Sequence, residues 1–131
     1  MYESANYMKH LNTFVLSEGE KFQELLLARE DVIPNKAAGS PPDGLDGWAY
    51  MMRTPAKDFA LLYFENQSEL PTLNNFIPGK EYYFKWFDTI TGKWGNKERI
   101  KVDSEGKLII PKFPGGEKIS SRDWAAKIIL K

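Results

Sequence analysis

Two hydrophobic patterns divide the chain near Pro34. Before this proline, apolar residues recur at the spacing of one helical face. They are Tyr7, Met8, Leu11, Phe14 and Val15. Ser17 then begins a Ser-Glu-Gly-Glu sequence that matches a capping box, in which Glu20 bonds back to the Ser17 amide. The pattern predicts a second helix that buries Phe22, Leu25 and Leu26 and ends before Pro34.

A loop separates this helical part from the rest of the chain. Residues 37–47 read Ala-Ala-Gly-Ser-Pro-Pro-Asp-Gly-Leu-Asp-Gly, and glycine and proline disfavour both helices and strand ladders. We therefore expect a helical segment over residues 1–36, a linker over 37–47 and a separate domain over 48–131.

From Trp48 onward the hydrophobic pattern has the two-residue period of β-strands. The predicted strands are Trp48–Thr54, Asp58–Glu65, Thr72–Phe76, Lys80–Asp88, Lys97–Val102, Lys107–Pro111 and Trp124–Lys131. Turn sequences rich in glycine, proline and aspartate separate them. About seven or eight short strands at this spacing predict a mainly β protein, an antiparallel β-sandwich preceded by two short α-helices.

The segment Asp88–Gly92 has the composition of a hairpin turn. Aspartate at the first position accepts hydrogen bonds from amides that follow it, and Gly92 suits a position with positive φ. The composition of this segment therefore has a structural explanation that needs no catalytic role.

Aromatic residues are the most informative part of the composition. The chain has 4 Trp, 6 Tyr and 8 Phe, concentrated between Lys80 and Trp94. Alternation places Tyr82, Phe84 and Trp86 on one face and Tyr83, Lys85 and Phe87 on the other, where the lysine indicates contact with water. Exposed rings stack on the C–H faces of sugars. The carbohydrate-binding candidates are Trp48, Tyr83, Phe87 and Trp94, with a role in the core or a domain interface as the alternative.

Charge and composition exclude several classes of protein. The chain has 18 basic and 18 acidic residues and no basic block, so nothing favours a nucleic-acid partner. No apolar run approaches the roughly 20 residues of a membrane span, and the N-terminus lacks a signal-peptide pattern. The sequence contains no cysteine, which excludes disulfides, thiolate metal sites and a cysteine nucleophile.

The sequence contains no recognisable catalytic or metal-binding set. His10 is the single histidine and sits beside the apolar helical stripe, with no serine or carboxylate arranged around it. Asp43, Asp46 and Asp58 match no known calcium loop, so solvated turn carboxylates are the better interpretation. No phosphate-binding or dinucleotide motif is present. We predict no catalytic residue, no metal and no cofactor in this chain.

Three segments resemble a known family. They are Trp48–Arg53, Asp58–Glu65 and Trp86–Trp94, the last reading Trp-Phe-Asp-Thr-Ile-Thr-Gly-Lys-Trp. They are similar to the C-terminal β-sandwich that follows the (β/α)8 barrel of apiosidase-like bacterial glycoside hydrolases, a module catalogued as a collagen-binding domain of a collagenase. In that family the turn usually has Pro and Arg where this chain has Thr89 and Ile90.

The resemblance implies a non-catalytic part of a larger enzyme. The N-terminal part resembles the closing helices of the barrel, and the family's catalytic carboxylates lie upstream of any position in this chain. Residues implied to contact the absent barrel are Tyr7, Leu11, Phe14, Phe22 and Leu26. The partners implied are that barrel and polysaccharide. The parent protein is expected to be secreted, periplasmic or attached to the cell surface.

Two functions are left open by the sequence, and a third is weaker. The first is an accessory domain that supports the barrel and holds carbohydrate. The second is a protein-binding module of the kind that the collagen label suggests. A free-standing small enzyme is the weakest, because no nucleophile, base or metal set assembles. Sugar binding is favoured if the four aromatic candidates form an open, roughly coplanar surface. A purely structural role is favoured if they are buried.

Overall fold

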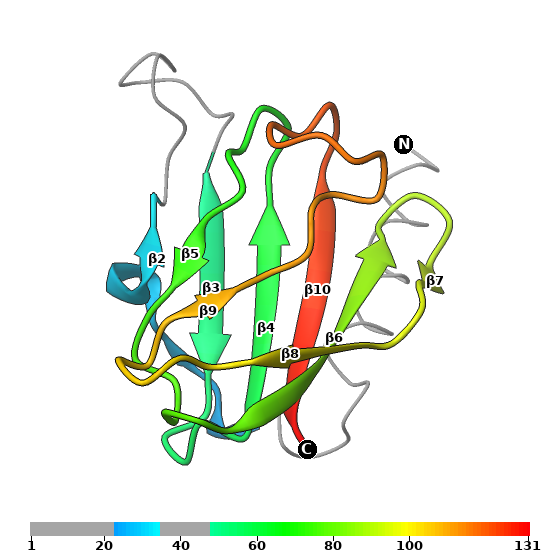
Figure 1. Ribbon diagram of the computed structural model, residues 1–131. Coiled ribbons are helices and arrows are strands. Elements are labelled where there is room, and N and C mark those ends of the chain that lie inside the picture. The colour runs from blue at the N-terminus through cyan, green and yellow to red at the C-terminus, as the bar shows by residue number, and fades with distance from the viewer. Residues whose placement is uncertain (1–22, 35–47) are drawn as a thin grey trace.

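The computed structural model describes residues 23–34 and 48–131 of the chain (Figure 1). These residues form ten strands and a short 3-10 helix, η2 (Arg29–Asp31). The strands are β1 (Leu26–Leu27), β2 (Val32–Ile33), β3 (Ala49–Arg53), β4 (Phe59–Phe64), β5 (Thr72–Leu73), β6 (Glu81–Asp88), β7 (Lys93–Trp94), β8 (Glu98–Lys101), β9 (Leu108–Ile109) and β10 (Trp124–Leu130). The helix predicted over the apolar stripe at 7–15, the residue Phe22 and the linker lie outside the described residues.

The strands form two antiparallel sheets. The larger sheet has the order β1-β3-β4-β10-β6-β7, with β8 also paired to β6, and the smaller has the order β2-β5-β9. Figure 1 shows the smaller sheet crossing in front of the larger one, which makes two layers. The predicted antiparallel β-sandwich is confirmed, and the predicted strands correspond to β3, β4, β5, β6, β8, β9 and β10.

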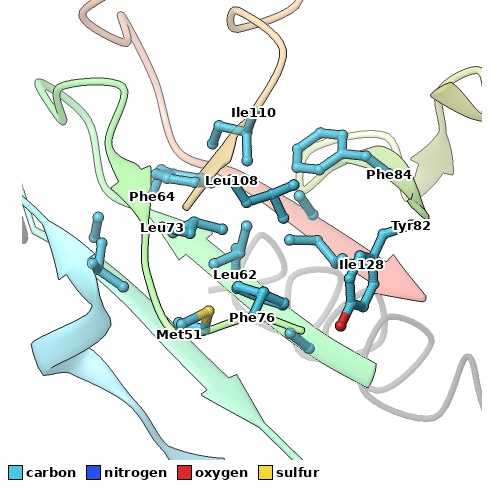
Figure 2. Close-up of a cluster of buried hydrophobic side chains, with 14 of the residues drawn as sticks. Met51, Leu62, Phe64, Leu73, Phe76, Tyr82, Phe84, Leu108, Ile110 and Ile128 are labelled. Carbon is cyan, nitrogen blue, oxygen red and sulfur yellow. The ribbon is translucent and has the colours of Figure 1, made fainter. Parts of the chain in front are cut away.

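The main core lies between the two sheets. Every second residue of the central strands points into it, as Leu62, Phe64 and Phe84 do, and the smaller sheet contributes Leu73 and Leu108. Figure 2 shows these side chains converging with those of the neighbouring strands and loops. Of the two predicted faces of β6, the one with Tyr82, Phe84 and Trp86 is this buried face.

The second predicted helix is wrong over the residues that the structure describes. Instead of helix, Leu26 and Leu27 pair with β3, and Val32 and Ile33 pair with β5. Hydrogen bonding to the edges of preformed sheets and the burial of Val32 outweigh the weak local helix preference. Leu25 is buried as predicted, but Leu26 is 61% exposed.

An ion pair fastens this N-terminal segment to the sandwich. Arg53 on β3 donates to the Asp31 carboxylate at 2.6 Å and to the backbone carbonyl of Asn74 at 3.1 Å. The guanidinium also lies over the Phe76 ring, 5.0 Å from its centroid. Arg53 therefore links η2, β3 and the segment after β5, and its charge is compensated where the side chain is buried.

The core assignment predicts a large loss of stability on truncation of Phe84. Phe84→Ala should lower the free energy of unfolding by about 3–5 kcal/mol, because the ring is buried and its loss leaves a cavity. Urea denaturation of both proteins measures this difference. Ile109→Ala is the control, since Ile109 is exposed on β9 and its truncation should change the free energy by less than about 0.5 kcal/mol. Equal losses in both variants would contradict the assignment.

Candidate functional site

The face of the larger sheet that points away from the smaller sheet, here called the outer face, carries rings and lysines in cross-strand rows. One row follows the pairing of Tyr50, Tyr63, Ala125, Phe87 and Trp94 across five strands. The next row contains Met52, Leu61, Lys127 and Lys85. A third contains Phe59, Ile129, Tyr83 and Arg99. The outer face is therefore apolar and aromatic with lysines near its middle.

Phe87 and Trp94 form an aromatic pair on neighbouring strands. Their ring centroids lie 4.8 Å apart with an interplanar angle of 58°, a tilted geometry that aromatic pairs favour. The ammonium of Lys127 lies 4.5 Å from the centroid of the Trp94 ring. Phe87 is only 1% exposed, packed in a second apolar cluster with Leu61 and Ala125. The expectation that water reaches this face therefore fails at Phe87, while Trp94 remains half-buried.

Tyr83 borders a hollow in the same face. The hollow has a volume of about 210 Å³ and is lined by Tyr83, Lys85, Lys97, Lys127 and Ile129. The Lys97 ammonium lies 4.3 Å from the centroid of the Tyr83 ring, a distance that suits a cation–π contact. Among the residues that the structure describes, the lining side chains are aromatic, aliphatic or basic. Lys127 is buried in this wall, with 8% of its side chain exposed.

The four aromatic candidates do not form one surface. Trp48 precedes β3 and stacks on Tyr50, with centroids 6.4 Å apart and planes at 19°. Two strands, β4 and β10, separate β3 from β6, on which the Phe87–Trp94 pair begins. The structure therefore brings Phe87 and Trp94 together and places Tyr83 on the same face. Trp48 lies away from them, toward the β1 edge of the sheet.

The hairpin between β6 and β7 positions Trp94. Asp88 accepts hydrogen bonds from the amides of Ile90 at 2.9 Å and Thr91 at 3.1 Å, and Gly92 adopts φ 72°. These observations confirm the predicted turn chemistry. Arg122, from the segment before β10, also donates to the Asp88 carboxylate. The turn is thereby attached to the central strands on which the site is built.

The environment of Asp88 changes its acidity. Burial acts to raise the pKa of Asp88, but hydrogen bonds from Arg122 and from the Thr91 and Ile90 amides outweigh it, so the pKa lies below its ordinary value. The ionised carboxylate is therefore the form that the folded hairpin stabilises.

Sequence reasoning missed two members of the site, Lys97 and Lys127. Lys127 occupies the position on β10 that alternation assigns to the outer face, which is a usable signal. What alternation does not give is the register that places Lys127 directly opposite Lys85. Lys97 precedes β8, and only the pairing of β8 with β6 brings it to Tyr83.

A second exposed feature lies at the β1 edge of the larger sheet. Leu26 and Leu27 on β1 are 61% and 62% exposed, and Met52 lies opposite Leu27 on β3. Leu26 and Leu27 also line a hollow of about 210 Å³ beside the Asp31–Arg53 ion pair. We call Leu26, Leu27 and Met52 the edge patch. Leu26 is one of the residues that the family resemblance implies contact a barrel, and that contact stays a prediction.

Within residues 23–34 and 48–131, no group of three histidine, cysteine, aspartate or glutamate side chains is arranged to hold a metal ion. No helix in that part of the chain is long and apolar enough to cross a membrane.

Solved structures share this fold. No protein-family model matches the chain, and no curated protein matches it. A glycoside hydrolase structure matches with a TM-score of 0.61 and 17% identity, over 97% of this chain and 25% of that chain. A glycoside hydrolase family 5 structure from Bacteroides vulgatus ATCC 8482 matches with a TM-score of 0.63 and 19% identity, over 97% of this chain and 24% of that one. The chain therefore has the fold of about a quarter of each of these longer chains.

The low pKa of Asp88 predicts how acid affects the hairpin. Folding lowers the pKa of Asp88, so its carboxylate stabilises the folded state at pH values above the unfolded pKa of about 4. That stabilisation is lost as the pH falls through the lower pKa of the folded state. Asp88→Asn should therefore be less stable than the parent at pH 7, and the difference should shrink in acid. Urea denaturation across about pH 2 to 7 measures it. Unfolding free energies that fall in parallel would show that Asp88 makes no such contribution.

Proposed function

We propose that this chain is a non-catalytic accessory domain of a glycoside hydrolase, which packs against the catalytic barrel and binds carbohydrate. The observation that carries the proposal is the pattern of coverage. Almost the whole chain, 97%, aligns with structures named as glycoside hydrolases, yet it spans only 24–25% of their length. The segments that resemble the sandwich of apiosidase-like enzymes agree with that pattern.

The edge patch supports the contact with a barrel. Its three side chains place exposed apolar surface on the edge strand β1 and on its neighbour β3, where a neighbouring domain can cover it. Leu26 is also one of the residues that the family resemblance implies contact the barrel. The patch is therefore the surface of the sandwich that we assign to the barrel.

The outer face supports the contact with carbohydrate. Trp94 is half-buried, and Phe87 and the ammonium of Lys127 contact its ring. A ring held rigidly in this way loses little conformational freedom when a sugar stacks on it. Because polysaccharides are too large to enter cells, we expect the parent enzyme to act outside the cytoplasm.

The proposal predicts that Trp94 contributes directly to carbohydrate binding. Trp94→Ala should raise the dissociation constant of a bound glycan about 5- to 30-fold, equivalent to about 1–2 kcal/mol, through loss of the stacking surface. NMR and tryptophan-fluorescence titrations against soluble pectic, hemicellulosic and host glycans measure the affinity. Ile90→Ala is the matched control, because Ile90 is exposed on the same hairpin.

Two results would count against carbohydrate binding at Trp94. One is a flat titration across the whole glycan panel, which would leave the domain with only a scaffolding role. The other is a loss of affinity in Trp94→Ala accompanied by a fall in melting temperature of the size that a core cavity causes, since the ring would then serve packing. Thermal denaturation of each variant separates these cases.

The edge patch makes a separate prediction in the full-length enzyme. Leu26→Ser combined with Leu27→Ser should barely change the unfolding of the isolated domain, because both side chains are exposed. In the full-length protein, the same change should speed protease cleavage between the barrel and the sandwich. Ile109→Ser, at an exposed position on the smaller sheet, is the control. Equal cleavage rates in the two variants would contradict an interface at the edge patch.

A further inference from the structure

We propose that the outer face of the larger sheet is a docking surface for the N-terminal part of this same chain. The occupant is the apolar stripe at residues 7–15, which lies outside the described residues and covers the face as a third layer. The surface is the second apolar cluster, here called the outer cluster: Leu25, Phe59, Leu61, Phe87 and Ala125. The inference goes beyond the proposed function, because it concerns a contact within the chain.

The first argument is the burial of side chains on the outer face. Phe59, Phe87 and Ala125 are each 1% exposed, and Leu61 is 6% exposed. Even Lys127, on the same face, is only 8% exposed. An antiparallel sheet with one face in water usually carries polar side chains there, and the smaller sheet lies on the opposite face (Figure 1). Burial of this degree therefore requires a covering layer on the outer face.

The second argument is the origin of the side chains in the outer cluster. Apart from Leu25, its members lie on β4, β6 and β10 of the larger sheet itself, and the partly buried Trp94 of β7 packs against them. Within residues 23–34 and 48–131, no apolar side chain of the smaller sheet belongs to this cluster. The covering layer is therefore assigned to a segment outside these ranges.

The composition of the remaining chain decides between its two stretches. Residues 35–47 contain only one large aliphatic or aromatic side chain, Leu45, among glycines, prolines and alanines. Residues 1–22 contain the complete stripe, with Tyr7, Leu11 and Phe14 at the spacing of one helical face. A helix with one apolar face needs an apolar partner surface. The N-terminal stretch is therefore the segment that suits the outer cluster.

The third argument is where the N-terminal stretch joins the described part of the chain. Leu25, which is 8% exposed and belongs to the outer cluster, lies three residues after Phe22. The ten residues from Val15 to Leu25 span up to about 33 Å when extended. As a helix, the stripe from Tyr7 to Val15 is about 12 Å long. Three adjacent strands spaced about 4.8 Å apart span about 10 Å, so the stripe matches the width of β4, β10 and β6.

The short connection also favours this occupant over a second copy of the chain. Two sites joined by a short flexible linker meet at an effective concentration in the millimolar range. A second copy at micromolar concentration competes poorly with such a contact. The family resemblance implies the barrel as the partner of Tyr7, Leu11 and Phe14, whereas this proposal assigns them to the sandwich. The edge patch is then left as the surface for the barrel.

Nuclear Overhauser effects in the intact chain test the contact directly, because they join protons that lie close together. We expect NOEs from the methyl groups of Leu11 and Val15 to the ring protons of Phe59 or Phe87. NOEs between Leu61 and Phe87 serve as the internal control for a folded outer cluster. A mixture of isotope-labelled and unlabelled chains separates contacts within a chain from contacts between chains.

Two NMR results would overturn the proposal. The first is a set of NOEs from the stripe to the outer cluster that appears only between labelled and unlabelled chains, since a second copy would then cover the face. The second is the absence of NOEs from the stripe to the outer cluster while the control NOEs are present. The stripe would then be available to the barrel.

Matched substitutions test which side of the stripe faces the sheet. Leu11→Asp places a charge on the apolar stripe, and Thr13→Asp places the same charge on the opposite side of the same predicted helix. We expect Leu11→Asp to lower the melting temperature of the intact chain by at least about 5 °C. It should also raise the fluorescence of the dye ANS at least about threefold, because ANS binds exposed apolar surface. Thr13→Asp should change the melting temperature by less than about 2 °C.

A milder pair keeps the comparison informative if Leu11→Asp prevents folding. Leu11→Ala should lower the melting temperature more than Thr13→Ala does, because only the leucine side chain loses contacts with the outer cluster. Equal changes in the two members of each pair would contradict the proposal, since a stripe without a partner in this chain has no preferred side. Glycan titrations of Trp94 variants test the proposed function separately.

Discussion

The central strands of the larger sheet are apolar on both faces, and this double burial determines most of the structure. In β4, Ala60, Leu62 and Phe64 point into the main core, while Phe59 and Leu61 are buried on the outer face. In the same way, β10 buries Ala126 and Ile128 inward and Ala125 outward. A sheet of this kind cannot leave either face in water. The smaller sheet covers one face, and on the other face Phe59, Leu61, Phe87 and Ala125 are buried in a second apolar cluster.

This double burial explains which parts of the fold the sequence predicts well. Strands β3, β4, β6 and β10 are long enough to stand out between turn sequences, as apolar runs or as a two-residue period, and their predicted bounds agree with the structure within a residue or so. The pieces that escaped prediction are short: β1, β2 and β7 have two residues each. A two-residue strand shows no period, and β1 and β2 also depend on partner strands that are remote in sequence. Leu26 and Leu27 illustrate this, because their local pattern is helical and their pairing with β3 is tertiary.

The site shows the same division between local and remote information. The sequence predicts local turn chemistry well. The roles of Asp88 and Gly92 follow from residue type, and in the structure Asp88 accepts the two amide hydrogen bonds and Gly92 has a positive φ. Alternation also placed Tyr83 and Phe87 on one face of β6. Burial was not readable, because the exposure of Phe87 depends on neighbours such as Ala125 on β10 and Trp94 on β7. The convergence of Lys85, Lys97 and Lys127 depends on the register of three strands, which no local pattern specifies.

The two proposed contacts occupy different parts of one rigid sheet, and this separation makes them compatible. The edge patch lies on β1 and β3, whereas Trp94 lies on β7, at the opposite end of the strand order. A barrel on the β1 edge therefore leaves the proposed glycan site on strands at the other side of the sheet. Because the strands between them are buried on both faces, the sheet resists bending. In the proposed arrangement the sheet itself sets the geometry between the barrel and the glycan site, so a polysaccharide held at Trp94 would approach the barrel from a fixed direction.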